Sequence, residues 1–475
     1  MNLKLTDRLL TDEFTVGGIW SGNADFKDSV PGNLTYSYSN NQLHVEFVHT
    51  DFVIGEVFET FYGLISRGEI VTLINARVSS TKGSNVQHTK IVADSMIIDS
   101  KPISNVGSFS HREINFTYTN MGDWFGINPW NQTRENNSYY YEEPLLKKYK
   151  IESIGGLLEE KVASTEKLNG IGMQEIKLSY VPYYKLTLNQ DKTIKELHEV
   201  VYKISLLFNL FLGKKLNIQF LDFPSEKEGL AGNKFKGTGR FYIRQLREVS
   251  KIHQPFPPYP YGTIANELEG YLNQFFFNFK KIKVIIQSFS VSFTGGNYVE
   301  NSFLDACLNL EVLHREFWDE HKEVNDELIK ATELIKNLSS QIEESIMEKI
   351  TSSIDNLSKP TLRKRILELL RELPQDLLKK IDLDGYNLNK GKDRRDFAIM
   401  CSNTRNYVTH GSSDDKLKTF SLLELIKVAK VLNIISEYHV MKIIGLADKD
   451  IIDAISHRNY YQNVLTNLYE FEDLN

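Results

Sequence analysis

The sequence is short of cysteine, and this narrows the chemistry that the chain can perform. Only Cys307 and Cys401 occur in 475 residues, and both fall in apolar helical patterns. Two thiols are too few for a disulfide framework or a cysteine-rich zinc cluster. No group of histidine, cysteine or carboxylate residues has a metal-ligand spacing. We therefore expect two buried core cysteines, a reducing compartment and no metal or other cofactor.

Long hydrophobic runs and a strong charge of either sign are also missing. The longest mostly apolar stretch covers residues 204–212, far short of the roughly 20 residues of a membrane-spanning helix. Residues 1–7 lack the apolar segment of a signal peptide, so we expect a cytoplasmic protein with no membrane partner. The formal net charge of −6 is mild, so any nucleic-acid site must be a local basic patch.

The first half of the chain has the patterns of a sheet. Residues 34–38 and 43–47 alternate between apolar and polar side chains around Asn40-Asn41. Asparagine tolerates the positive φ of a tight turn, so this stretch predicts a hairpin. Further strand patterns cover residues 69–79, 90–98, 113–119 and 175–188, whereas Lys234–Arg240 is typical of a basic, glycine-containing loop. One helix is expected after the capping box of Thr193 and Glu196, ending at Gly213.

The second half is predicted to be nearly all helical. Clustered prolines in residues 255–260 suit neither a helix nor a central strand and mark the expected boundary. Helices are expected over residues 266–288, 298–321 and 394–410, with a long amphipathic run over 328–350. Lys359-Pro360 and Pro374 bracket a short basic helix, and Ser421 with Glu424 caps a last long helix. The fold class is therefore α+β, with a β-rich front domain and a helical bundle.

The end of the 394–410 helix carries the most informative residues of the chain. On a helical wheel, Phe397, Met400, Cys401, Thr404, Tyr407 and Val408 form the apolar stripe. Asn406 and His410 are four residues apart on the opposite face, and Arg405 lies at the edge of the stripe. Gly411-Ser412-Ser413 then ends the helix, where the dipole favours a positive charge. A fixed cation beside a histidine suits metal-free cleavage of a phosphodiester.

The spacing alone is a weak indication of function. Arg247…His253 and Arg315…His321 have the same loose spacing in this chain, and a solvated helix end with a polar cap is the more frequent explanation. Glu311 adds to the functional interpretation, because it falls within the apolar sector of the 298–321 helix. A carboxylate there needs a partner. Arg405 is a candidate, which Glu311 would orient, and a lysine or arginine on another helix is the alternative.

The helical half resembles the HEPN superfamily, and within it the Apea-like HEPN proteins of bacterial anti-phage defence. The resemblance rests on Phe303–Glu311, the Leu362–Ile366 helix, Asp396-Phe397, Arg405-Asn406 and His410. It covers residues 298–475. The front half is similar to the N-terminal domain that accompanies this HEPN type. The expected domains are therefore a β-rich sensor or regulatory domain at 1–262 and a helical HEPN domain at 263–475.

The resemblance implies an endoribonuclease that needs no metal and cleaves by attack of the ribose 2′-OH. Arg405, Asn406 and His410 would be catalytic, with Glu311 behind them. Arg363, Lys364, Arg365, Arg394 and Arg395 would contact RNA. They lie in residues 359–396, which contain eleven lysines and arginines and seven acidic residues. The alternative is that these basic residues only form a solvated helix face.

The expected partners are an RNA substrate, for which transfer RNA is a candidate, and a phage-derived trigger that binds the N-terminal domain. A second copy of the chain is also expected, in a homodimer or higher symmetric oligomer. The expected role is growth arrest or cell suicide on infection. One alternative is a non-catalytic HEPN module that binds RNA, nucleotide or protein. Another is nucleotidyl transfer by a separate protein.

Overall fold

The structure is a computed structural model that describes residues 4–48, 52–65, 68–82, 88–126, 129–132, 139–169, 175–228, 233–245, 256–292, 298–318, 326–338, 343–411 and 418–465. It is α+β, with a β-rich N-terminal region and a helical C-terminal region, as predicted. Two compact units divide the chain. The first comprises Met1–Val249 and Pro260–Phe276, and the second comprises Ser250–Tyr259 and Phe277–Asn475. The predicted boundary at 262/263 falls inside the segment Pro260–Phe276.

The first unit is organised around a 13-stranded antiparallel sheet in the order β11-β12-β13-β8-β14-β15-β7-β5-β4-β1-β2-β3-β6. Its strands are β1 (Glu13–Ser21), β2 (Val30–Ser37), β3 (Gln42–Val48), β4 (Val57–Ile65), β5 (Ile70–Lys82), β6 (His88–Val92), β7 (Ser95–Asp99), β8 (Ser110–Tyr118), β11 (Lys148–Ile151), β12 (Gly156–Asn169), β13 (Glu175–Thr193), β14 (Ile218–Glu228) and β15 (Lys234–Ile243). A separate two-stranded sheet pairs β9 (Trp130–Gln132) with β10 (Tyr139–Tyr141).

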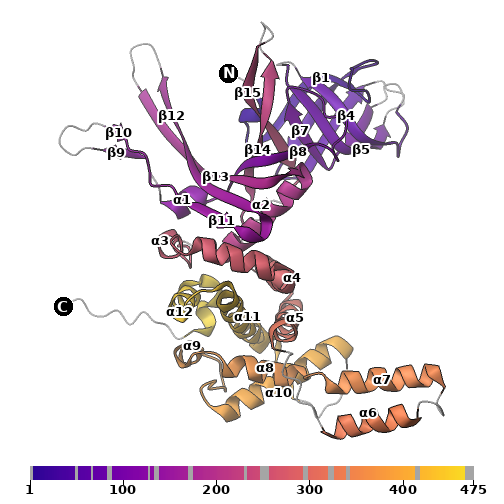
Figure 1. The fold of residues 1–475 in the computed structure, drawn as a ribbon, viewed down its shortest axis with the longest axis vertical. Helices are drawn as coiled ribbons and strands as arrows, with labels where there is room; N and C mark the ends of the chain where they lie inside the picture. Colours follow the sequence, from indigo (N-terminus) through magenta and orange to yellow (C-terminus); the bar gives the residue numbers. More distant parts are fainter. Residues whose placement is uncertain are drawn as a thin grey trace. The chain divides into compact units, whose positions relative to one another are not determined.

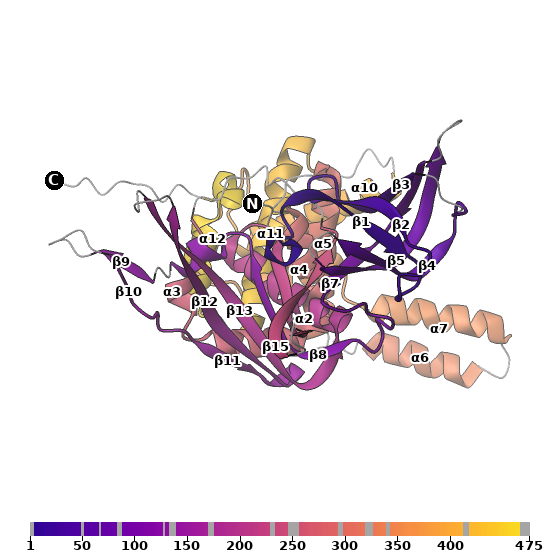
Figure 2. The same cartoon turned by 90° about the horizontal axis from the view of Figure 1, so that it is seen from above.

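The strands β1 to β6 close into a small barrel. The long strand β5 pairs with β4 and also with β6, so the order β5-β4-β1-β2-β3-β6 returns to β5. Closure removes the edges of these strands. The other half of β5 pairs with β7, where the rest of the sheet begins. Figures 1 and 2 show this ring of strands and the longer strands β12 and β13 at the other end of the same sheet.

Aromatic packing explains the barrel interior. Trp20 of β1 stacks on Phe61 of β4, with ring centroids 6.5 Å apart, and both are fully buried. Gly63 faces Trp20 so closely that a Cβ there would lie 2.3 Å from the ring. The predicted hairpin is confirmed as β2 and β3, since Ser37 pairs with Gln42 and Asn41 has a φ of 52°. The residues of the turn therefore set the register between β2 and β3.

A long helix packs on the part of the sheet that lies outside the barrel. Helix α2 (Ile194–Leu212) begins at the capping box of Thr193 and Glu196 and ends at Gly213 in the left-handed conformation, so this prediction is confirmed. It packs on β8 and β13, where the Tyr118 hydroxyl donates to the carbonyl of Val201. The short elements of this unit are η1 (Leu5–Asp7), α1 (Met121–Phe125), η2 (Glu152–Ile154) and α3 (Tyr261–Ile264).

The second unit is helical. Its elements are α5 (Val299–Phe317), α6 (Asp326–Leu338), α7 (Glu344–Ser358), α8 (Leu362–Arg371), α9 (Gln375–Lys380), α10 (Gly391–His410), α11 (Leu422–Ile444), α12 (Asp448–His457) and η4 (Asn459–Val464). Helix α4 (Leu268–Ser292) begins in the first unit, and its residues from Phe277 onward belong to the second. The central packing joins α5 to α8, α10 and α11, and α8 to α10. Helices α6 and α7 form a projecting hairpin (Figure 1).

Several predictions of elements need correction. Lys234–Arg240, predicted as a loop, belongs to strand β15, which pairs with β14 and β7. The strand tolerates its basic residues because Lys234 and Lys236 are exposed and the buried Arg240 pairs with Asp222. Residues 90–98, predicted as one strand, form two strands, β6 and β7, which pair with different parts of β5. The amphipathic run over 328–350 is two helices, α6 and α7. His321, the predicted end of the helix now seen as α5, lies outside the described residues. No helix in the described ranges combines the length and apolarity that a bilayer crossing needs.

Candidate active site

Helix α10 ends where the sequence predicts, at His410. Gly411 follows in the left-handed conformation with a φ of 62°, and its N–H donates to the carbonyl of Tyr407 at 2.8 Å. Thr404 is buried, and its hydroxyl accepts from the N–H of Phe420 at 3.0 Å, which fixes the last turns against the chain leading into α11. The predicted residues Ser412 and Ser413 lie outside the described part of the chain. The helix end that carries the motif is thus anchored from its buried side.

Arg405 and Glu311 lie beside each other, on α10 and α5. The Nη2 of Arg405 is 3.8 Å from the Oε1 of Glu311, and the two side chains are 35% and 27% exposed. The Nη1 of Arg405 is 3.4 Å from the Oδ1 of Asn406. A guanidinium carries five N–H donors, and these contacts use few of them. Arg405 is therefore held at the edge of the core with donors still directed to solvent.

Arg365 supports the same turn of α5 from the other side. It is only 8% exposed, and its Nη1 donates to the backbone carbonyl of Glu311 at 2.8 Å. Its Nε donates to the carbonyl of Pro360 at 2.9 Å. The first contact ties α8 to the residue that carries the carboxylate beside Arg405, and the second holds the Arg365 side chain against the segment that leads into α8. This placement contradicts the predicted RNA contact of Arg365, because its guanidinium is buried against backbone carbonyls.

The two cysteines pack directly behind this arrangement. Cys307 and Cys401 are buried free thiols on α5 and α10, as the sequence predicts. Burial raises the pKa of the Cys307 thiol, and the nearby Glu311 carboxylate raises it further. Burial raises the pKa of Cys401 as well. Because the thiolate is the reactive form, both residues serve packing rather than chemistry.

Asn406 and His410 are exposed on the solvent side of α10. In the part of the chain that the structure describes, the His410 side chain makes no hydrogen bond or ion pair. Tyr407 was predicted to lie on the buried stripe, and this is wrong, because its side chain is 50% exposed. It belongs to the last turn, which extends beyond the packed part of the helix. An exposed aromatic ring beside the motif can stack on an RNA base. The position of Tyr407 in the sequence, one turn before His410, was the signal from which this role could have been predicted.

A second histidine lies nearby but is a different kind of residue. His314, one turn after Glu311 on α5, is 1% exposed, and its Nε2 is 2.5 Å from the Oε2 of Glu368 on α8. Sequence reasoning missed this pair. A histidine with so little exposed surface cannot reach a bound phosphate, so it stabilises the α5–α8 packing instead.

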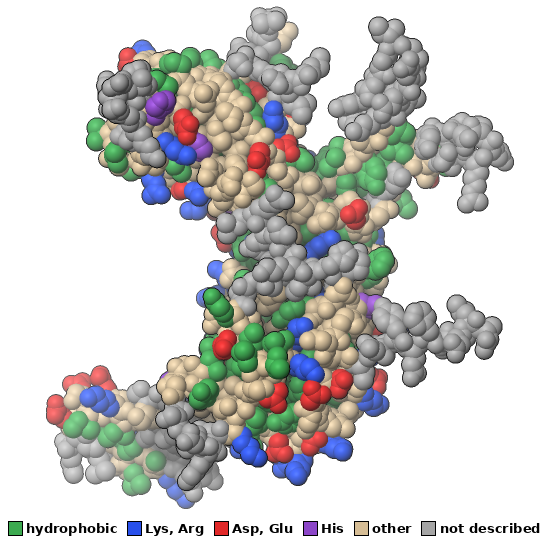
Figure 3. All heavy atoms as spheres, turned by 180° about the vertical axis from the view of Figure 1, so that it is seen from behind, with side chains coloured by type: hydrophobic (Ala, Val, Ile, Leu, Met, Phe, Trp, Pro, Cys, Tyr) green, Lys and Arg blue, Asp and Glu red, His purple; other side chains and the backbone are tan. Residues whose placement is uncertain are grey.

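The other residues predicted to contact RNA lie outside the motif, on α8 and in the first turns of α10. Arg363 and Arg395 are exposed, and Lys364 and Arg394 are half-buried. Arg395 precedes Arg405 by ten residues on α10, which is about 15 Å along the helix axis. Figure 3 shows acidic and basic side chains intermingled on the helical unit. Arg395 is therefore separated from the motif along the helix.

The arrangement can bind a phosphate and move a proton. A partly exposed guanidinium, an amide and an imidazole occupy two successive turns at one helix end. No three histidine, cysteine or acidic side chains gather into a metal-holding set within the described ranges. In the first unit, Trp124 is buried beside Phe208, whereas Tyr140 and Tyr141 are each 48% exposed.

Comparison with known protein families gives two matches. The family model for the ApeA N-terminal domain 1 matches residues 15–275, more than half of the chain. The model for the Apea-like HEPN domain matches residues 304–450, which include Glu311, Arg405 and His410. No curated protein and no solved structure matches the chain.

Proposed function

Since the chain belongs to the ApeA family, with an ApeA N-terminal domain followed by an Apea-like HEPN domain, we propose that it is a metal-independent endoribonuclease of anti-phage defence. The HEPN domain is a ribonuclease-type module. The observation that carries the proposal is the exposed end of α10, where Arg405, Asn406 and His410 project from an anchored helix.

In the proposed reaction, the ribose 2′-oxygen attacks the adjacent phosphorus and the 5′-oxygen leaves. The new P–O bond closes a 2′,3′-cyclic phosphate, and the broken bond leaves a 5′-OH. His410 transfers a proton, either from the 2′-OH or to the leaving oxygen. Arg405 donates to the phosphoryl oxygens as their negative charge grows, and Asn406 orients the phosphate or the imidazole.

Glu311 and Arg365 act behind these groups. The carboxylate of Glu311 limits the positions that the Arg405 guanidinium can adopt. Arg365 fixes the backbone of Glu311 through its carbonyl. Neither residue touches RNA in this proposal, so both are positioning residues.

We also propose that the active form is a homodimer or a higher symmetric oligomer. One histidine cannot easily act at both ends of the reaction, and a second motif would supply the other proton transfer. Sedimentation of the purified protein at the concentration used for cleavage tests this. A monomer that cleaves at the full rate would contradict it.

The proposed RNA substrate includes transfer RNA as a candidate, and the proposed trigger is a phage-derived molecule at the N-terminal domain. Growth arrest on infection follows from releasing such a nuclease in the cell. Cleavage of an RNA set that excludes transfer RNA would correct the substrate without affecting the mechanism.

The test incubates purified full-length protein with total cellular RNA in EDTA and maps the new ends. We expect cyclic phosphate ends with the wild type and none with His410→Ala or Arg405→Ala. His457→Ala is the matched control, because His457 is an exposed histidine at the last position of α12, as His410 is of α10. RNA from phage-infected cells supplies the trigger in a parallel reaction.

A different result would favour the binding module. In that case His410→Ala would bind RNA as tightly as the wild type, and neither protein would cleave RNA from infected cells. If His457→Ala abolished cleavage as fully as His410→Ala does, the loss of cleavage would instead reflect a loss of folding.

A further inference from the structure

The outermost strand of the first unit's sheet has a partly covered edge. Strand β11 pairs with β12 on one side, with Lys148 opposite Glu159 and Lys150 opposite Leu157. In an antiparallel pair, successive residues direct their N–H and C=O alternately toward and away from the partner. The N–H of Glu160 donates to the carbonyl of Lys147 at 2.9 Å, so Lys147 faces β12. Lys148, Lys150 and Glu152 therefore direct their backbone groups outward.

Helix α4 covers two of these three positions with side chains. The carboxylate of Glu269 accepts from the N–H of Lys150 at 2.8 Å. Asn273 donates to the carbonyl of Lys150 at 2.7 Å and accepts from the N–H of Glu152 at 2.8 Å. The two side chains complete the edge as a neighbouring strand would, which protects it from further pairing.

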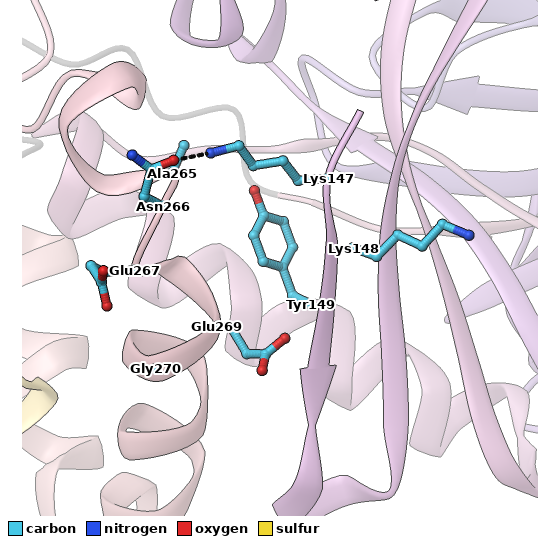
Figure 4. Close-up of a pocket in the computed structure, with 8 residues that line it drawn as sticks. All are labelled: Lys147, Lys148, Tyr149, Ala265, Asn266, Glu267, Glu269 and Gly270. Carbon is cyan, nitrogen blue, oxygen red and sulfur yellow. Dashed lines mark hydrogen bonds between the residues drawn. The ribbon is translucent and has the colours of Figure 1, made fainter. Parts of the chain in front are cut away.

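The third position, Lys148, opens into a pocket of about 480 Å³. The pocket lies within the first unit, between β11 and the segment from α3 to the first turn of α4, and its lining includes Glu267, Glu269 and Gly270. Figure 4 shows the Nζ of Lys147 bonded to the Oδ1 of Asn266, at 2.6 Å, with the ring of Tyr149 beside it. Among the described residues, none bonds to the outward backbone groups of Lys148. A Cβ added at Gly270 would meet nothing within 4 Å.

We propose that this pocket binds an extended peptide segment of another protein, which pairs with the outward N–H and C=O of Lys148. One peptide residue supplies the matching acceptor and donor, as in the addition of a strand to a sheet edge. The pairing ends at Lys150, because Glu269 and Asn273 already occupy its backbone groups. The bound segment is therefore short, and the volume is within the usual range for a ligand pocket.

The charges of the lining favour a peptide over an anion or nucleic acid. Lys147 is engaged by Asn266, and the Nζ of Lys148 is 2.8 Å from the Glu159 carboxylate. Two carboxylates, those of Glu267 and Glu269, line the same pocket and would repel a phosphate. Main-chain hydrogen bonding is what the site offers. This proposal is independent of the ribonuclease, because it concerns only the first unit.

The test selects random linear peptides on immobilised full-length protein and measures their affinity for two variants. Gly270→Leu places a side chain in the pocket at a helical position. Gly262→Leu is the matched control, because its added Cβ also meets nothing within 4 Å and Gly262 does not line the pocket. We expect Gly270→Leu to weaken binding at least tenfold and Gly262→Leu to change it less than twofold. Thermal midpoints of both variants verify that the fold is kept.

Peptides with one N-methylated backbone amide complete the experiment. Methylation at the pairing residue should weaken binding at least tenfold, although the side chains are unchanged. The proposal is overturned if no peptide is enriched over a protein-free control or if Gly270→Leu binds as well as the wild type. It is equally overturned if N-methylation at every position has no effect.

Discussion

Two arginine–glutamate pairs in the helical unit have the same chemistry and opposite surroundings. Arg458 and Glu437 are both fully buried, with the Nη2 of Arg458 2.7 Å from the Oε1 of Glu437, and the Tyr461 hydroxyl donates to the other carboxylate oxygen at 2.8 Å. Arg405 and Glu311 are partly exposed and 3.8 Å apart. The first pair is closed to any ligand. The second leaves guanidinium donors facing solvent at the end of α10.

The difference separates a stabilising pair from a functional one. A buried pair gives little net stability, but losing one partner leaves the other charge unpaired in the core. A partly exposed pair gives little stability in either case, because water screens it. Replacing an arginine should therefore change folding at Arg458 and RNA cleavage at Arg405.

The largest effect is expected from Arg458→Leu. It leaves the Glu437 carboxylate without its cation, and the free energy of unfolding should fall by about 3–5 kcal/mol. Denaturant unfolding measures this. The double variant Arg458→Leu with Glu437→Leu should recover much of the loss, because no charge then remains buried. A double variant as unstable as the single one would contradict this account of the pair.

Arg405→Leu should have an effect of nearly the same free energy, but on catalysis rather than on folding. Losing a donor to the developing phosphoryl charge should slow cleavage about 10²–10³-fold. The free energy of unfolding should change by about 1 kcal/mol or less. Single-turnover cleavage and unfolding are measured on the same preparation. A large fall in stability with this variant would place Arg405 with Arg458 as a structural residue.

Arg365→Met should affect both properties to an intermediate degree. It removes the donors to the carbonyls of Glu311 and Pro360, which should cost about 1–3 kcal/mol of stability. A shifted Glu311 should also slow cleavage about tenfold at temperatures where the protein is folded. Arg363→Met is the matched control, because Arg363 is exposed on the same helix. Equal effects of the two variants would argue against positioning by Arg365.

Glu311→Gln should have a smaller effect, because the amide can still hydrogen-bond to Arg405. We expect a rate loss of about fivefold or less, corresponding to about 1 kcal/mol. The loss should be larger at low salt than at high salt, because screening weakens the charge interaction that the amide lacks. A rate that is unchanged at every salt concentration would remove Glu311 from the positioning role.

The smallest effects are expected at the outlying basic residues. Arg363→Gln, Arg394→Gln and Arg395→Gln should each weaken RNA binding slightly and similarly for all sequences. Each true phosphate contact should lower the slope of affinity against salt by about 1. Binding titrations over a range of salt concentrations measure this. An unchanged slope would assign the residue to the solvated helix face.

The sequence predicted those parts of the fold that depend on local signals. The Asn40-Asn41 turn, the capping box of α2 and the end of α10 at Gly411 each involve residues close in sequence. Barrel closure was not predictable, because it depends on β5 pairing with β4 on one side and with β7 and then β6 on the other. A strand pattern shows which residues alternate but not which strands they meet.

The candidate site shows the same limit. The residues of the motif could be identified from one helix, but Arg365 could not be separated from Arg363 and Lys364 as three consecutive cations. A helix turns about 100° per residue, and this turns Arg365 toward the core with Ile366 and Leu369, while Arg363 faces solvent. Tyr407 was misplaced for a related reason, since the apolar stripe continues past the point where α10 is covered.

The most direct test of the central claim maps RNA ends in cells during phage infection. Cells carrying the wild type, His410→Ala or His457→Ala at equal protein levels are infected and their RNA ends are compared. We predict new 2′,3′-cyclic phosphate ends after infection with the wild type and His457→Ala, and none with His410→Ala. The same RNA ends with all three proteins would contradict the assignment of the α10 terminus as a ribonuclease site.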